Sequence, residues 1–486
     1  MVFSSVEFLF MLFPGALALY FLLSRLPDKV KGLRDPLLNL LLIAASLLFY
    51  AWGEPVLLIL LLASVFANWL IGLGIARGTG RKLLLALAVV LNIGLLGVFK
   101  YAGFATDILN TITGLHLPVP QIALPIGISF YTFQALSYVI DVYRDPTLVQ
   151  KNGFRLLLYI SFFPQLIAGP IVRYGDIAAQ LQSRRVSWDG AMQGFRRLFV
   201  GLGKKILIAD ELAVLVNVCF TDSAAGQMPA GFAWLGAVAY LLQIYFDFSG
   251  YSDMAIGMGH IFGFRFPENF NYPYASLGIK DFWRRWHITL STWFREYLYI
   301  PLGGNRKGKT RMLINQLIVF FCTGLWHGAN MTFVVWGLYN GLFLILESND
   351  ILPVRRVKHP LGKVLVRVYT LVAVTVGFVI FRADNLTQAM AYLGSMFSPG
   401  NPFAWGDSGV WREVLPCLTP YFFTILGVAV IGAAPIVPAL RRFCAARPRV
   451  DAVAQRLSYL WALVMITLCA MSLAAGTYSA FIYFQF

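Results

Sequence analysis

Two histidines, His287 and His327, stand 40 positions apart in a stretch rich in apolar and basic residues. A neutral imidazole can remove a proton from a hydroxyl group near pH 7, which is the role of a general base. An ionisable residue inside an apolar membrane segment is costly and by default marks a functional site. We therefore interpret His327 as a catalytic candidate; the alternative is an imidazole that only hydrogen-bonds a carbonyl group on a neighbouring helix.

His327 lies in a long run without formal charge, between Arg311 and Glu347. About 20 residues cross a bilayer, so this run is too long for one straight span and long enough for two short ones. The signals that break a helix lie near its centre, at Gly328 and Asn330. The sequence thus predicts a hairpin that enters the membrane, turns at His327 and returns. At about 1.5 Å per residue, the first arm carries His327 roughly 24 Å into a core about 30 Å thick.

The preceding residues, 276–304, have helical spacing, with apolar side chains on one face and basic or polar side chains on another. The apolar face holds Phe282, Trp286, Leu290, Trp293 and Tyr297, and the basic face holds Lys280, Arg284, His287, Ser291 and Arg295. This pattern predicts one helix that lies in a membrane interface. His287 is on its polar face, where a solvated side chain is the alternative to a chemical role.

The motifs around both histidines, WHITLS at 286–291 and LWHGA at 325–329, resemble those of the membrane-bound O-acyltransferases. Further matching stretches lie at 163–170, 245–253 and 267–273. The resemblance covers nearly the whole chain and is closest to the bacterial branch that O-acetylates exopolysaccharides. It implies an all-α polytopic membrane fold with broken or re-entrant helices around a central tunnel. In this family the histidine matching His327 is essential, and the one matching His287 lines the same tunnel.

The resemblance also implies a direction of transfer. Acetyl is taken from cytoplasmic acetyl-CoA and passed across the bacterial inner membrane. Periplasmic SGNH-hydrolase-like transferases then attach it to an exopolysaccharide, with alginate as the favoured polymer. Acetyl-CoA is then the acyl donor, and no cofactor is expected to stay bound. Phe481, Tyr483 and Phe486 resemble the FxYxxF tail of a small partner protein in teichoic-acid D-alanylation, whose tyrosine carries the acyl group. This implies an acyl relay at Tyr483; the alternative is an aromatic belt at the membrane interface.

Several enzyme classes lack their motifs in this sequence: there is no GxSxG, no P-loop and no HExxH. We therefore expect no serine-hydrolase triad, no nucleotide hydrolysis and no zinc.

Acyl transfer from a thioester suits the remaining residues. The donor is already activated, so the enzyme needs only to orient donor and acceptor and to remove one proton from a hydroxyl group. The basic residues considered for the phosphates of acetyl-CoA are Lys280, Arg284, Arg285, Arg306 and Lys307. For most of them, ordinary anchoring on the cytoplasmic side is the alternative.

Composition sets the class of protein. Of the 486 residues, 58% are hydrophobic and 13% are charged, about half the charged share of an average soluble protein. Many apolar runs exceed 18 residues, which predicts an α-helical protein with many membrane spans. The net charge of +16 fits basic cytoplasmic loops, and no nucleic-acid-binding module is recognisable. The five scattered cysteines predict neither a disulfide framework nor a metal site.

Alternating basic and near-neutral loops predict the topology, with both termini in the periplasm. The expected segments are 6–23, 37–52, 56–76, 83–104, 124–143, 154–172, 206–220, 232–262, 312–347, 365–381, 416–438 and 457–475. Residues 105–122 and 382–413 are expected as external loops. Counting broken segments, we expect about eleven to thirteen membrane segments in a single domain, residues 1–486, whose characteristic motifs lie within 124–347.

Two other functions stay open at this point. One moves a different acyl group, such as D-alanine from a carrier protein to teichoic acid. The other is a transporter or channel in which His327 relays protons without a covalent step. Transporters often carry internal repeats with paired broken helices, and this sequence has no evident repeat, which weighs against that alternative.

Overall fold

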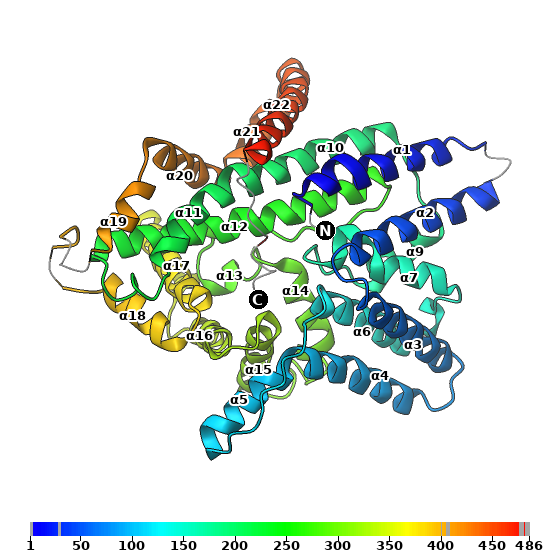
Figure 1. Ribbon diagram of the computed structural model, residues 1–486, viewed down its shortest axis with the longest axis horizontal. Helices are drawn as coiled ribbons and strands as arrows, with labels where there is room; N and C mark the ends of the chain where they lie inside the picture. Colours follow the sequence, from blue (N-terminus) through cyan, green and yellow to red (C-terminus); the bar gives the residue numbers. More distant parts are fainter. Residues whose placement is uncertain (1–2, 28–30, 400, 405–408, 476–480, 482–486) are drawn as a thin grey trace. The chain divides into compact units, whose positions relative to one another are not determined.

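The computed structural model describes residues 3–27, 31–399, 401–404, 409–475 and residue 481. This part of the chain consists of helices and connecting turns and contains no β-strand (Figure 1). The prediction of an all-α protein is confirmed. The chain divides into two compact units. The first unit comprises Met1–Phe199 and Tyr251–Glu268, and the second comprises Val200–Gly250 and Asn269–Phe486.

Seven helical segments of the described residues are long and apolar enough to cross a bilayer. They are Gly32–Ala51, Leu58–Ala76, Arg81–Thr113, Ala230–Ile261, Met331–Ser348, Pro360–Arg382 and Pro448–Ala474. Trp411–Cys417 and Pro420–Ala433 form one further candidate, bent by 66°. The chain is therefore a multi-pass membrane protein; the larger expected number, which includes short and broken segments, stays a prediction.

The first unit is built from helices that follow one another along the chain. Its helices are α1 (Phe13–Ser24), α2 (Lys31–Ala51), α3 (Leu58–Ala76), α4 (Arg81–Leu96), α5 (Ala102–Thr113), α6 (Ile128–Arg144), α7 (Gly153–Ser161), α8 (Phe163–Leu166), α9 (Tyr174–Gln182), most of α10 (Trp188–Gly203) and the end of α12 (Ala230–Ile261). The loop expected at 105–122 begins later than predicted, because α5 continues to Thr113 and ends where Gly114 takes a φ of 70°.

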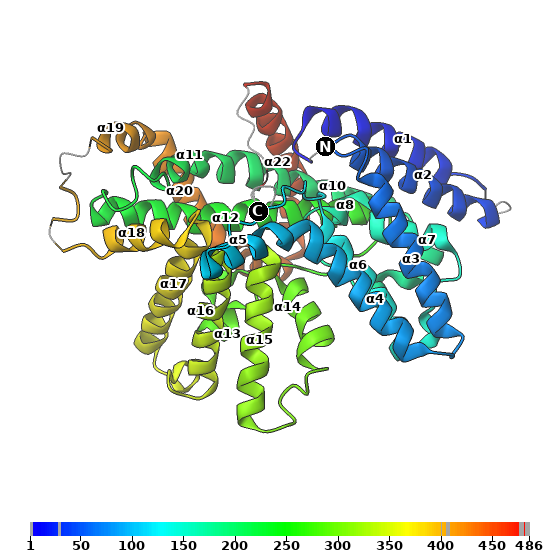
Figure 2. The ribbon, with the colours of Figure 1, turned by 60° about the horizontal axis from the view of Figure 1, so that its bottom comes forward.

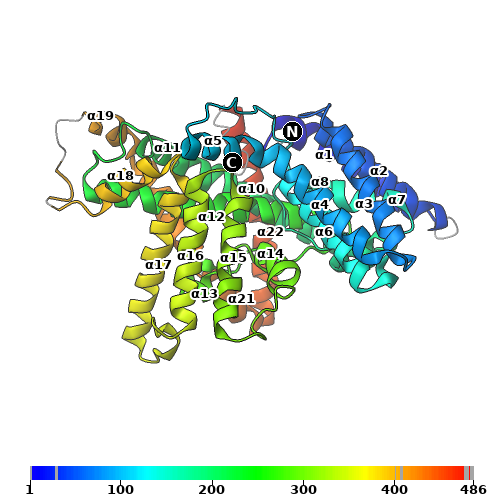
Figure 3. The ribbon, with the colours of Figure 1, turned by 90° about the horizontal axis from the view of Figure 1, so that it is seen from below.

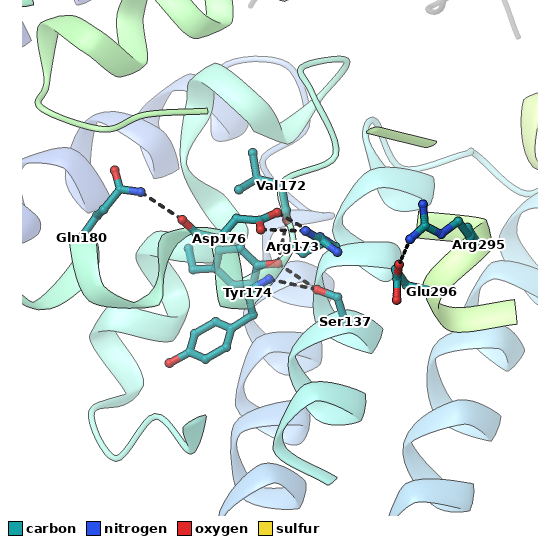
Figure 4. A network of polar contacts seen from close by, with 9 residues as sticks. Ser137, Val172, Arg173, Tyr174, Asp176, Gln180, Arg295 and Glu296 are labelled. Atoms are coloured by element: carbon teal, nitrogen blue, oxygen red, sulfur yellow. Dashed lines mark hydrogen bonds and ion pairs between the residues drawn. The ribbon is translucent and has the colours of Figure 1, made fainter. Parts of the chain in front are cut away.

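The segment expected at 154–172 is broken, as the resemblance implies for some helices of this fold. Helix α7 ends at Ser161, α8 is a single turn, and the chain then leaves helical geometry until Tyr174. Buried polar side chains satisfy this irregular backbone, as they must away from water. The hydroxyl of Tyr159 donates to the carbonyl oxygen of Val172 at 2.8 Å. The N–H of Tyr174 donates to Ser137 Oγ at 3.3 Å (Figure 4). An ion pair of 2.8 Å between Arg173 and Asp176 follows (Figure 4).

The second unit holds both candidate histidines. Its helices are the end of α10, α11 (Asp210–Cys219), most of α12, α13 (Ile279–Phe282), α14 (Ile288–Phe294), α15 (Lys309–His327), α16 (Met331–Ser348), α17 (Pro360–Arg382), α18 (Leu386–Met396), α19 (Trp411–Val414), α20 (Pro420–Ala433), α21 (Ile436–Ala445) and α22 (Pro448–Ala474). Helices α15 and α16 lie side by side, with α17 against α16 (Figure 2). The hairpin predicted for 312–347 is confirmed as these two helices, with its turn at 328–330.

One prediction for this unit is wrong. The single helix expected over 276–304 is two short helices, α13 and α14, separated by residues 283–287 and followed by a π-helical turn, Arg295–Tyr299 (Figure 3). The helix is interrupted because His287 takes the left-handed backbone conformation, with φ of 45°. Residues 382–413, expected as an external loop, contain a helix, α18, whose N-terminus is capped by the side chain of Asn385; the external position of this loop stays a prediction.

Candidate active site

The α15–α16 hairpin brings two backbones into direct contact through glycines. A Cβ atom on Gly324 would lie 2.3 Å from the carbonyl oxygen of Phe333, and one on Gly337 would lie 2.3 Å from the carbonyl oxygen of Phe320. Small residues at such contacts let membrane helices approach closely. The turn is held by Asn330, whose side chain accepts from the N–H of Thr332 at 3.1 Å and donates to the carbonyl oxygen of Asp384 at 2.7 Å. This turn fixes His327 at the end of α15.

The imidazole of His327 lies among aromatic rings and is 4% exposed. Its ring centroid is 5.0 Å from that of Trp326, 5.1 Å from Trp336 and 5.2 Å from Phe381. These rings contribute apolar surface, so the surroundings of the imidazole hold little water and have a low dielectric constant. Such surroundings strengthen polar interactions with a bound substrate and slow hydrolysis of a reactive ester.

His287 is fully buried, so the predicted position on an exposed basic face is wrong. The left-handed turn at His287 directs the ring into the unit, against the edge of Phe248, with the ring centroids 4.7 Å apart. Asn269 supplies the hydrogen bonds that the start of α14 needs. Its carbonyl oxygen accepts from the N–H of Ile288 at 3.0 Å, and its Oδ1 accepts from the N–H and the hydroxyl of Thr289 at 3.2 and 2.8 Å.

The structure brings His287 and His327 together. Their ring centroids are 6.3 Å apart, with the planes inclined at 64°, and Trp326 contacts both rings. His287 lies between the candidate spans, and burial lowers the pKa of its imidazole to about 3. The ring is therefore neutral at pH 7. Two imidazoles in an apolar enclosure can bind a hydroxyl group and remove its proton.

A buried carboxylate anchors the segment that carries His287. Glu347, at the end of α16, accepts from the N–H groups of Ile279 at 2.6 Å and Lys280 at 2.9 Å. A negative charge is favourable at the N-terminus of a helix such as α13. Thr370 on α17 accepts from the N–H of Gly278 at 2.9 Å, so three helices are tied together here. In the sequence, Glu347 is recognisable only as the carboxylate that ends the uncharged run after Arg311. A single carboxylate in that position was the one indication of its role.

Comparison of the sequence with known proteins supports the assignment of this site. A family model described as the membrane-bound O-acyltransferase family matches residues 144–351, which include both histidines. A protein of Pseudomonas putida named probable alginate O-acetylase is 41% identical to this chain over the full length of both. The chain belongs to the membrane-bound O-acyltransferase family. It is thus an acyltransferase, and a transporter that forms no covalent bond is no longer a candidate.

Other relatives extend the range of polymers within this family. A protein of Pseudomonas aeruginosa, also named probable alginate O-acetylase, is 45% identical over 82% of this chain and 75% of its own length. A peptidoglycan O-acetyltransferase of Helicobacter pylori is 36% identical over 82% of this chain and 80% of its own length. The branch predicted from the motifs is confirmed by the relatives that carry the alginate name.

The basic residues considered for the acyl donor differ in their surroundings in this acyltransferase. Arg285 forms an ion pair with Asp281 at 3.1 Å, whereas Arg284, Arg306 and Lys307 are exposed. Lys280 is half-buried. Burial, and then the positive charges of Arg355 and Arg284, lower the pKa of Lys280, while Glu347 acts in the opposite direction.

The positive charges of Arg284 and Arg355 thus act on Lys280, and we call these three residues the basic cluster. An anionic ligand would offset these charges.

The polar residues of α12 are paired with basic residues of neighbouring segments. In the second unit, Lys205 Nζ lies 2.7 Å from Asp210 Oδ1 and 2.9 Å from Asp247 Oδ1, and all three residues are buried. In the first unit, Asp253 forms an ion pair of 2.8 Å with Arg197. These ion pairs support a role of the aspartates in contacts between neighbouring segments.

Tyr483 lies outside the described residues. Phe481, two positions earlier, is described and buried, and its ring centroid lies 6.1 Å from that of Phe248. Phe248 is the ring that contacts His287. Phe248 thus lies between Phe481 and a candidate catalytic histidine.

Proposed function

We propose that this acyltransferase takes acetyl from acetyl-CoA at the cytoplasmic side of the inner membrane and passes it outward for O-acetylation of an exopolysaccharide, with alginate as the favoured polymer. The buried pair of His287 and His327, with ring centroids 6.3 Å apart, is the observation that carries the acyl-transfer part. The names of the relatives with 41% and 45% identity support alginate. Peptidoglycan is the second candidate polymer, on the name of the relative with 36% identity.

In the proposed reaction, an acceptor hydroxyl attacks the thioester carbonyl. A C–O bond forms, the C–S bond breaks, and the hydroxyl proton passes through the imidazole of His327 to the leaving thiolate. His327 acts as the general base, a role that contributes about 10²- to 10⁴-fold in rate. The aromatic rings around His327 support this role, because exclusion of water limits hydrolysis of the thioester.

The donor's phosphates are proposed to bind at the basic cluster, Lys280, Arg284 and Arg355, with Arg285, Arg306 and Lys307 as further contacts. Arginine and lysine bind phosphate through charge-assisted hydrogen bonds. The lowered pKa of Lys280 supports this assignment, because it reflects burial and neighbouring positive charge that a phosphate would offset.

The proposed topology places the basic loops in the cytoplasm and both termini in the periplasm. A periplasmic SGNH-hydrolase-like acetyltransferase would then receive the acetyl group and attach it to the polymer. We propose Tyr483 as the relay between the two proteins. The contact of Phe481, two positions earlier in the sequence, with Phe248, whose ring meets His287, supports this proposal.

Incubation of the purified protein in nanodiscs with acetyl-CoA labelled in the acetyl group tests the donor. We expect the wild type to carry the acetyl label itself or to transfer it to small alcohols that serve as acceptors. We expect neither product with His327→Ala. Parallel incubation with D-alanyl carrier protein tests the other acyl group. Transfer from the carrier protein alone would overturn acetyl-CoA as the donor. Polymer acetylation in cells supplied with alginate or peptidoglycan pathways then distinguishes the two polymers.

A further inference from the structure

The imidazole of His287 has one polar neighbour that fixes its chemical state. Its Nδ1 lies 3.1 Å from Oδ1 of Asn269, and both side chains are fully buried. An amide oxygen only accepts hydrogen bonds, whereas an imidazole nitrogen donates when protonated and accepts when unprotonated. The position of the imidazole proton therefore depends on which atom of the Asn269 amide faces the ring.

Thr289 determines the orientation of that amide. Its backbone N–H lies 3.2 Å from Asn269 Oδ1 and can only donate. Rotating the amide by 180° would place an NH₂ group against this N–H and leave two buried donors facing each other without an acceptor, which is unfavourable. The hydroxyl of Thr289, 2.8 Å from the same oxygen, adds a second donor. Oδ1 therefore faces His287, and Nδ1 of His287 carries the proton.

We infer that Asn269 is a positioning residue that holds neutral His287 in the tautomer protonated on Nδ1, which leaves Nε2 as a hydrogen-bond acceptor for substrate. Nε2 is buried and has no hydrogen-bond partner among the described residues. The group that binds there must bring an O–H or N–H. A thioester carbonyl or a phosphate brings only acceptors and does not fit this atom. His287 in this state cannot donate to an oxyanion, so its role differs from that of an oxyanion-hole donor.

The backbone conformation of His287 also depends on Asn269. The left-handed conformation of His287 is unfavourable for a residue with a Cβ atom and persists only where its surroundings hold it. The carbonyl oxygen and Oδ1 of Asn269 bond the first two N–H groups that follow His287, at Ile288 and Thr289. One residue thus fixes the turn, the start of α14 and the tautomer together.

Selective ¹⁵N labelling of histidine, observed by NMR in nanodiscs without any acyl donor, tests the inference. The His287→Gln variant assigns the His287 signals. We expect Nδ1 in the protonated range and Nε2 in the unprotonated range in the wild type. A wild-type signal showing the proton on Nε2 would overturn the inference. Because no substrate is present, this result is independent of whether acetyl transfer is the correct activity.

Two variants at Asn269 separate its roles. Asn269→Leu removes the acceptor, so we expect both His287 signals to change and polymer acetylation to fall by about tenfold or more, as for other histidines held in the wrong tautomer. Asn269→Asp keeps an acceptor for Nδ1 and for Thr289 but adds a negative charge, which favours the imidazolium. His287 should then titrate at higher pH than in the wild type. Unchanged His287 titration in Asn269→Asp, or unchanged signals in Asn269→Leu, would overturn the inference.

Asn315 provides the matched control. It is equally buried in the same unit, and its side chain donates to the carbonyl oxygen of Gly304 at 3.0 Å. Asn315→Leu also removes a buried amide, so it carries a comparable structural cost. We expect it to leave the His287 signals unchanged. Equal changes in Asn315→Leu and Asn269→Leu would contradict a specific role for Asn269.

Discussion

The imidazole rings of His287 and His327 lie with their centroids 6.3 Å apart, although 40 positions separate them in the sequence. Different devices hold the two rings. His327 ends a helix whose hairpin is closed by glycine contacts, and His287 sits in a left-handed turn bonded to Asn269. The chemistry of the site thus depends on interactions well beyond the two rings, and each can be tested separately.

Replacing His327 should abolish acetyl transfer without removing the protein from the membrane. Loss of a general base lowers the rate by about 10²- to 10⁴-fold, so polymer acetylation in His327→Ala should fall below detection. The measurement is acetyl content of the polymer, with membrane abundance checked by immunoblot. His116→Ala, in an exposed segment, is the control. Normal acetylation by well-expressed His327→Ala would contradict the role of His327 as the general base. Polymer acetylation should also be impaired in His287→Ala.

Closing the α15–α16 hairpin should require glycine at position 324. The Cβ atom of Gly324→Ala would lie 2.3 Å from a backbone carbonyl oxygen that cannot move without shifting α16. We expect a loss of about 1–3 kcal/mol in the free energy of unfolding, together with reduced activity. Gly94→Ala is the control, since its added Cβ meets nothing within 4 Å. Equal thermal stability of the two variants would show that the close contact is not needed.

Acidification should leave His287 neutral. Burial lowers its pKa to about 3, whereas the unfolded chain takes up this proton near pH 6.5. Stability is therefore retained above about pH 6.5 and falls as the pH decreases toward 3, by up to about 1.4 kcal/mol per pH unit. Thermal unfolding at several pH values should show a shallower decline in His287→Gln, with His116→Gln as the control. A steeper decline in His287→Gln would contradict the lowered pKa.

Labelling from outside the cell should reveal the orientation. Single cysteines introduced at Gly53 and Thr113 should react with an impermeant reagent, and cysteines at Arg81 and Lys358 should react only after permeabilisation. The reason is the excess of basic residues in loops predicted to be cytoplasmic. The background is a variant whose five natural cysteines have been replaced. The reverse pattern would place the basic cluster in the periplasm, away from acetyl-CoA.

The relay hypothesis makes a sharp prediction for Tyr483→Phe. This change keeps the aromatic ring and its preference for the membrane interface but removes the hydroxyl that would carry acetyl. We expect polymer acetylation to be lost as completely as in His327→Ala. Tyr478→Phe, in the same segment, is the matched control. Near-normal acetylation by Tyr483→Phe would eliminate the relay and leave an aromatic belt as the role of this ring.

The sequence alone determined the membrane class, most of the long helices and the hairpin at His327. These features follow from local properties: the length of apolar runs, the absence of charge between Arg311 and Glu347, and helix-breaking residues near Gly328. The motifs around both histidines identified the family before any geometry was known. Local patterns succeed here because a membrane span satisfies its backbone hydrogen bonds within itself.

The family resemblance implied that His287 and His327 line one tunnel, but only the tertiary structure decided how His287 is buried and which residues hold it there. The spacing of residues 276–304 suits one amphipathic helix, so periodicity placed His287 on the polar face. The helix is interrupted instead at the left-handed turn of His287, where Asn269, 18 positions earlier, supplies hydrogen bonds to the start of α14. Glu347, 68 positions after Ile279, supplies them to the start of α13. Such contacts depend on which distant segments pack together. The spacing of residues within one segment does not predict these contacts, because a free N–H group at a helix end can donate to any acceptor that folding brings near.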